Sequence, residues 1–137
     1  MRKKSIAYDK AKKFAIRIIE LKKWLCEEHR EYSIADQILR SGTSIGANIA
    51  ESFDAVSLND FSNKLSIALK ECSETKYWLE IMFESRLLDE ERYNSFYADC
   101  NELYLILSSS VKTLSEKKNQ ASQLSTHDSR LSIKKEL

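Results

Sequence analysis

The chain has 137 residues, of which 42% are hydrophobic and 31% charged, and its formal net charge is +1. This length predicts one domain with its own core. The small net charge argues against a protein whose entire surface binds nucleic acid. No apolar run is long enough to span a membrane, and the basic opening lacks the apolar segment of a secretory signal, so we expect a bacterial cytoplasmic protein. The absence of proline and the presence of only two glycines favour long helices over a sheet.

Apolar residues recur every three or four positions through most of the chain and predict four helices. The first helix covers about residues 5–29, and its expected core face is Ala7, Ala11, Phe14, Ile18, Leu21 and Leu25. Ser33 is expected to cap the second helix. The expected core face of that helix is Ile34, Ile38, Gly42, Ile45, Ile49 and Phe53.

Ser57 with Asp60 three residues later is typical of a capping box and predicts the start of the third helix. The expected core face of this helix is Leu58, Phe61, Leu65, Ala68, Cys72, Leu79 and Phe83. Asp89, followed by acids, predicts the cap of the fourth helix. The expected core face there is Tyr93, Phe96, Cys100, Leu103, Leu107, Val111 and Leu114.

Four such helices with short connections predict an all-α fold, an antiparallel up-down four-helix bundle over residues 1–114. Residues 115–137 lose the apolar period and turn polar. We interpret them as a flexible C-terminal tail, disordered or only loosely helical.

Residues that carry catalytic or metal chemistry are isolated in the sequence. Three widely spaced cysteines without a C-x-x-C pair favour buried, reduced thiols, and His29 and His127 stand alone. Glycine-rich phosphate loops are missing, and the helical carboxylates Glu71, Glu74 and Glu80 have no Glu-x-x-His partner. We therefore expect no enzyme activity, no metal and no cofactor.

Both glycines lie in the segment LRSGTSIGANIAES, residues 39–52, inside the second predicted helix. A glycine within a helix costs about 1 kcal/mol relative to alanine. Close approach of a neighbouring backbone at Gly42 and Gly46 would offset this cost, so we expect a tight helix–helix contact within the bundle.

Two helix faces outside the predicted core indicate an interface between subunits. The second helix carries a flat stripe of short side chains opposite its isoleucine face, and the third carries a tryptophan and two isoleucines away from its core stripe. The predicted interface residues are Arg40, Ser44, Asn48, Glu51, Ile67, Glu74, Trp78 and Ile81. The alternative is a solvated polar stripe with scattered exposed apolar side chains.

Charge is distributed unevenly along the chain. Residues 1–30 carry ten Lys or Arg against four acids, a net charge of +6, and the rest sums to −5. A basic first helix can contact the phosphates of RNA or DNA, and its candidate binding residues are Lys12, Lys13, Arg17, Lys22 and Lys23. The alternative is a solvated helix face with ion pairs between residues four apart. Aromatic side chains that could stack on bases are not evident beside these lysines, so we do not expect recognition of a specific base sequence.

The segments LRSGTSIGANIAES and FSNKLSIALKECSETKYWLEIM resemble the signature of the 23S rRNA intervening-sequence protein family, and the resemblance covers about residues 7–114. The matching positions are Arg40, Ser44, Ile45, Asn48, Ile49, Ala50 and Glu51, then Phe61, Leu65, Ile67, Ala68, Ser73 and Glu74. Two positions depart from the signature, since Ser52 replaces a glycine and Gly46 stands where proline is usual. A basic residue that often follows is missing from FDAVS.

The resemblance implies a small bacterial four-helix bundle that forms a ring-like homo-oligomer, a pentamer, with suspected nucleic-acid binding. A relative in fold is the accessory protein of diversity-generating retroelements, which binds a reverse transcriptase and nucleic acid. Two functions are therefore expected as alternatives. One is RNA or DNA binding through the first helix, and the other is a protein-interaction scaffold or accessory subunit for a partner enzyme such as a reverse transcriptase.

Overall fold

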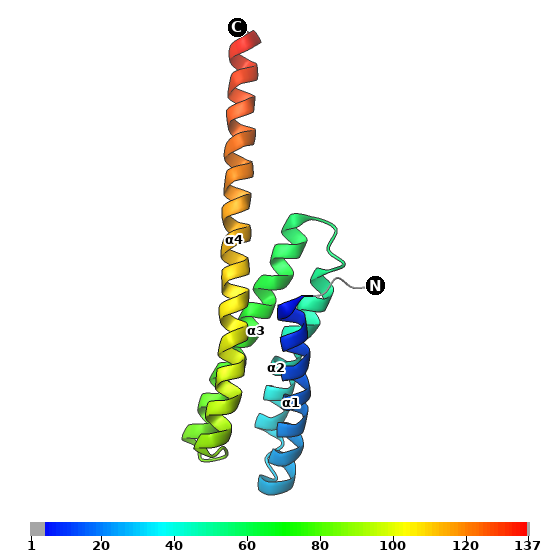
Figure 1. The fold of residues 1–137 in the computed structure, drawn as a ribbon, viewed down its shortest axis with the longest axis vertical. Helices are drawn as coiled ribbons and strands as arrows, with labels where there is room; N and C mark the ends of the chain where they lie inside the picture. Colours follow the sequence, from blue (N-terminus) through cyan, green and yellow to red (C-terminus); the bar gives the residue numbers. More distant parts are fainter. Residues whose placement is uncertain (1–4, 137) are drawn as a thin grey trace.

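The computed structural model describes the backbone of residues 5–136 and the side chains of residues 5–124. It contains four helices, α1 (Ile6–His29), α2 (Ser33–Ser52), α3 (Leu58–Glu84) and α4 (Glu90–Glu136). Successive helices run in opposite directions and pack side by side, and α4 projects far beyond the other three (Figure 1). The predicted all-α, up-down four-helix bundle is confirmed.

Local hydrogen bonds explain where the helices begin. The side chain of Ser5 accepts from the N–H of Tyr8 at the start of α1, and Ser57 accepts from the N–H of Asp60 at the start of α3. The carboxylate of Asp89 accepts from the N–H of Arg92 at 3.1 Å and caps α4. The capping roles predicted for Ser57 and Asp89 are therefore confirmed.

The start of α2 differs from the prediction. Ser33 is the first helical residue rather than the cap, and Tyr32 precedes it without a side-chain capping bond. The carboxylate of Glu31 accepts instead from the N–H of Ile34 at 3.1 Å. An acid near the helix start satisfies a free N–H and also complements the helix dipole, which is why Glu31 can replace a serine cap.

The core consists of the predicted stripes of α1, α2 and α4 almost unchanged. Phe14, Ile18, Ile45, Leu103 and Leu107 are all at most 2% exposed. Cys72 and Cys100 are buried and Cys26 is half-buried, and all three thiols are free, as the cysteine spacing predicted.

The two ends of the core stripe of α3 were predicted wrongly. Leu58 is 47% exposed because it is the first residue of α3, and Phe83 is 36% exposed in the last turn. Met82 is buried in place of Phe83, which instead stacks on Tyr93 at a centroid distance of 4.5 Å. Met82 and Phe83 lie three and four residues after Leu79, steps that both fit a helix face, so the period did not separate them and the packing of the bundle places Met82 in the core.

The contact between α1 and α2 is the tight one that the glycines predicted. A Cβ added to Gly42 would lie 2.9 Å from Cγ1 and 3.0 Å from Cγ2 of the buried Ile18. A Cβ added to Gly46 would meet Ala11 at 3.5 Å, which is ordinary contact. Both glycines therefore lie close to α1, but only Gly42 excludes a methyl group.

The first and last helices have the smallest contact of any packed pair. Ion pairs cross between them, Lys10 with Glu102 and Arg17 with Asp99. The bundle is therefore packed most extensively from α1 to α2, α2 to α3 and α3 to α4, while ion pairs contribute to its closing contact.

The expected end of the fourth helix near residue 114 is wrong. The helix α4 continues from Glu90 to Glu136 as one element of 47 residues. Leu114 is its last buried residue among those with described side chains, and Leu124 is 64% exposed. The segment 115–136 is thus polar as predicted but helical, because its helix-favouring residues need no core to continue an existing helix.

Within residues 5–136, none of the helices combines the length and apolarity that membrane crossing requires.

Replacement of the two glycines by alanine is expected to give opposite results. Gly42→Ala should lower the free energy of unfolding by about 1 kcal/mol or more, because β-branched Ile18 cannot move away without disturbing the core. Gly46→Ala has room for its methyl group and should raise stability by up to about 1 kcal/mol through helix propensity. Urea denaturation of both variants tests this difference, and equal stabilities would show that no glycine is required at residue 42.

Candidate interaction surfaces

The five basic residues of α1 proposed to contact phosphates divide into two groups. Lys12, Lys13 and Lys23 are exposed and form no ion pair with any residue that the structure describes. Lys22 pairs with Asp36 of α2 at 2.9 Å, and Arg17 pairs with Asp99 of α4. Three of these five positive charges are therefore free of ion pairs within the described residues and available to a ligand.

Arg17 is held by three groups of α4 at once. Besides its ion pair with Asp99, the guanidinium donates to Ser95 at 2.8 Å and lies 4.1 Å from the ring centre of Phe96. A guanidinium stacked on a ring and paired with a carboxylate has a fixed geometry. Arg17 thus joins α1 to α4 across their small contact, a role the sequence did not indicate.

α4 carries further lysines, which were not among the candidate phosphate ligands predicted from the sequence. Lys112 and Lys117 are exposed and Lys118 is half-buried on the stretch of α4 on either side of Leu114, its last buried residue with a described side chain. Beyond this stretch, α4 leaves the bundle at the end where α1 begins (Figure 1). The sequence separates these lysines from Lys12 and Lys13 by about a hundred residues, and only the antiparallel fold directs the stretch toward the end where α1 begins.

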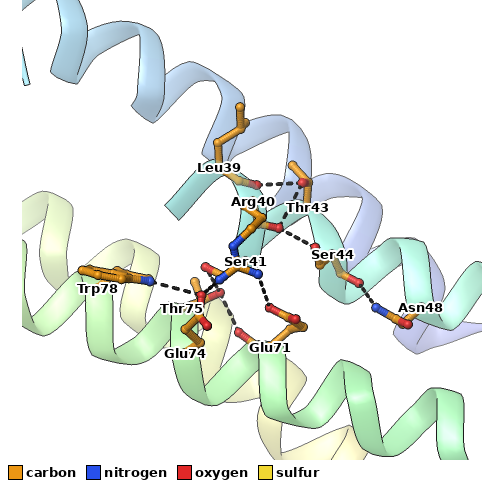
Figure 2. A network of polar contacts seen from close by, with 10 residues as sticks. All are labelled: Leu39, Arg40, Ser41, Thr43, Ser44, Asn48, Glu71, Glu74, Thr75 and Trp78. Atoms are coloured by element: carbon orange, nitrogen blue, oxygen red, sulfur yellow. Dashed lines mark hydrogen bonds and ion pairs between the residues drawn. The ribbon is translucent and has the colours of Figure 1, made fainter. Parts of the chain in front are cut away.

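The proposed interface residues of α2 and α3 bind one another in a polar network (Figure 2). Arg40 of α2 pairs with Glu74 of α3 and lies 3.3 Å from the carboxylate of Glu71. The indole N–H of Trp78 donates to Glu74 at 3.2 Å. The network orients Arg40 and Trp78 within one chain, and 48% of the Arg40 side chain stays exposed.

A buried pair of hydroxyls lies beneath this network. Thr75 Oγ1 lies 3.0 Å from Ser41 Oγ and 2.8 Å from the carbonyl of Glu71, and neither Ser41 nor Thr75 is exposed at all. Both residues were missed because small polar side chains on a core face carry no hydrophobic signal. Their mutual contact satisfies two groups that would otherwise be costly to bury.

The remaining polar residues of the proposed interface also have partners within the chain. Ser44 donates to the carbonyl of Arg40, and Asn48 donates to the carbonyl of Ser44 at 2.9 Å. Glu51 pairs with Lys64 of α3 at 2.9 Å. Asn48 and Ser44 are half-buried and Glu51 is exposed.

The apolar residues proposed for this interface are less exposed than expected. Ile67, Trp78 and Ile81 are half-buried, and Trp78 packs against the core. Ile16 and Ile19 on the outer side of α1 are instead 52% and 42% exposed. Two neighbouring exposed isoleucines on one helix form an apolar patch that the sequence analysis did not single out.

A cavity of about 630 Å³ lies where α1 ends beside the turn from α3 to α4, and we call it the turn-end cavity. Trp24, Phe83 and Arg92 are among its lining residues. The guanidinium of Arg92 lies 4.1 Å from the ring centre of Trp24 and pairs with Asp89 at 2.7 Å. The hydrogen bonds from the side chain and backbone of Arg92 hold the pKa of Asp89 below its usual value.

The buried thiols have no reactive features. A hydrogen bond with Cys100, followed by burial, raises the pKa of Cys72 far above its ordinary value, which disfavours the thiolate. The described part of the chain contains no group of three or more His, Cys, Asp or Glu placed to hold a metal ion.

The fold defines a small helical bundle with charged and apolar side chains exposed on its surface. Residues 3–109 match the family of 23S rRNA-intervening sequence proteins, and the chain belongs to this family. It is 48% identical to a Bacteroides thetaiotaomicron protein of unknown function from the S23 ribosomal protein family. The crystal structure of that protein superposes with a TM-score of 0.77, covering 78% of this chain and 99% of the other. Among curated proteins, none matches the chain significantly.

The family match ends at residue 109, within α4. The part of α4 that carries Lys112, Lys117 and Lys118 therefore lies beyond the matched region.

The Ser41–Thr75 contact is expected to behave as a coupled pair. Thr75→Val should lower the free energy of unfolding by about 1–3 kcal/mol because it leaves the buried Ser41 hydroxyl without its partner. The double variant Ser41→Ala/Thr75→Val removes both groups and should cost less than the sum of the two single variants. Chemical denaturation of the three variants measures this coupling, and strictly additive losses would contradict it.

Proposed function

We propose that this protein is a non-enzymatic, homo-oligomeric protein of the bacterial cytoplasm that binds RNA or DNA through phosphate contacts. The observation that carries the proposal is the position of the lysines. Lys12 and Lys13 are exposed in the first half of α1, and Lys112 and Lys117 are exposed on α4, which leaves the bundle at the end where α1 begins (Figure 1). Exposed lysines without ion-pair partners attract a polyanion and read no base sequence.

The name of the family adds support, because it refers to intervening sequences of 23S rRNA. The small net charge of +1 agrees with a local binding surface rather than a generally basic one. In a ring of identical subunits, such as the pentamer that the family resemblance implies, each subunit would repeat this surface and strengthen weak phosphate contacts.

A second candidate function is a scaffold or accessory subunit for a partner enzyme, such as a reverse transcriptase. The exposed pair Ile16 and Ile19 favours it, since apolar patches of this kind are buried in protein interfaces. The two functions differ in their response to salt, because apolar contacts do not release counterions.

Nucleic-acid binding should depend steeply on salt and on the two exposed lysines in the first half of α1. A short structured RNA is titrated at about 50 mM and about 200 mM salt, and the double variant Lys12→Gln/Lys13→Gln should bind more weakly with a salt slope smaller by about 2. Lys70→Gln removes an exposed lysine of α3 and serves as the control for a mere change in charge. Light scattering in the same buffers measures the mass of the complex.

RNA binding that is absent at low salt would contradict the nucleic-acid function and favour the scaffold. Equal losses in the α1 and α3 variants would place the binding surface elsewhere.

Self-association is tested at Asn48, a half-buried residue of the predicted interface on α2. Asn48→Trp should leave helicity and thermal unfolding almost unchanged but lower the mass of the assembly, because a bulky ring separates surfaces packed around a small amide. Asn94→Trp on an exposed position of α4 is the matched control. An unchanged mass for Asn48→Trp, measured by light scattering, would show that this face of α2 lies outside the interface.

A further inference from the structure

The turn-end cavity has the size of a ligand site. Its volume of about 630 Å³ falls in the range of clefts that bind small molecules or peptide side chains. A second cavity of about 330 Å³ adjoins it and shares Asp89 and Arg92 as lining residues. The two cavities follow the small contact between α1 and α4, where side chains leave the surface incompletely filled.

The same local arrangement occurs in both cavities. Arg92 lies 4.1 Å from the ring centre of Trp24 beside the carboxylate of Asp89, and Arg17 lies 4.1 Å from that of Phe96 beside Asp99. Each site holds a guanidinium against an aromatic ring and neutralises it with a carboxylate. The chain thus binds two of its own arginines by one kind of geometry.

A third ring and carboxylate in the turn-end cavity lack such an arginine. Phe83 stacks on Tyr93 with an interplanar angle of 14° and is 36% exposed. Glu84, the next residue, lines the same cavity and forms no ion pair with any described residue. Phe83 and Glu84 therefore offer a ring and a carboxylate to a cation from outside.

The end of the bundle that contains the cavity is acidic, although the cavity lining itself has two carboxylates, Glu84 and Asp89, and two arginines, Arg86 and Arg92. Residues 27–31 and 80–92, which meet at this end, contain eight carboxylates and three arginines, a net charge of −5, so the excess of acids comes from residues outside the lining. Burial raises the pKa of Tyr93, and the carboxylates of Glu80 and Glu84 raise it further, so their field reaches the ring on which Phe83 stacks. Such a field attracts cations and opposes phosphates.

We propose that the turn-end cavity is a docking site for an arginine-bearing peptide segment of a partner protein. The guanidinium of the peptide stacks on Phe83 and pairs with Glu84. This site is independent of the proposed nucleic-acid surface, which lies at the opposite end of the bundle and has the opposite charge.

Arg86 makes the proposal testable because it lines the cavity and opposes a cation. It follows the end of α3 with φ 66°, a left-handed conformation that glycine adopts without strain. Arg86→Gly therefore removes the opposing charge while keeping or improving the fit of the backbone. A basic peptide should bind this variant more tightly, whereas an anionic ligand should bind it more weakly.

The experiment measures fluorescence anisotropy of a labelled seven-residue peptide, Gly-Ser-Arg-Gly-Arg-Ser-Gly, with the full chain, and of the same peptide with aspartate at both arginine positions. The arginine peptide should bind and the aspartate peptide should not. Glu84→Gln and Phe83→Leu should each weaken binding about fivefold, and Arg86→Gly should strengthen it. Glu116→Gln on the exposed surface of α4 is the control for charge, and thermal melting checks that each variant is folded.

Failure of the arginine peptide to bind at about 1 mM would overturn the proposal. So would equal effects of Glu84→Gln and Glu116→Gln. Weaker binding by Arg86→Gly would show that the cavity prefers an anion, and a structured RNA that competes for it would assign the cavity to nucleic acid instead.

Discussion

The close contact of α1 with α2 at Gly42 is the constraint on which the rest of the bundle depends. Ile18 fills the space that a side chain at Gly42 would occupy, so the core faces of the first two helices fit together only with a glycine at this position. The spacing of this pair determines where α3 packs against α2, and α4 then follows α3 through a short turn. Packed interiors tolerate little change in volume, which explains why α2 keeps a destabilising glycine at its centre.

A consequence of this sequential packing is that the bundle closes weakly. The contact between α1 and α4 is the smallest of the packed helix pairs, and ion pairs cross it. Arg17 compensates through its ion pair with Asp99 and its stacking on Phe96. The turn-end cavity, which Arg86 and Arg92 line, also lies between residues of α1 and α4. The region where α1 meets α4 therefore includes both a predicted phosphate ligand that is used internally and a cavity lined by rings and carboxylates.

The arrangement of the helices also separates charge along the bundle. Antiparallel packing brings the basic start of α1 to the end from which α4 projects, and it brings the acidic end of α1 to the acidic turn before α4 (Figure 1). Neither end is evident in the net charge of +1. Under the two proposals above, the basic end would attract a polyanion and the acidic end a cationic segment.

The sequence by itself determined the four helices, most of their core faces, the caps at Ser57 and Asp89 and the need for small residues beside α1, because periodicity and capping act over a few residues. Other features depend on contacts between residues far apart in the sequence, and the tertiary structure alone decided these. It buried Met82 rather than Phe83, paired Arg17 with Asp99, joined Ser41 to Thr75, and placed Trp24 near Phe83. It also continued α4 to residue 136, past the last buried leucine. These outcomes depend on which side chains meet from distant parts of the chain, and a local pattern of polar and apolar residues carries no information about that.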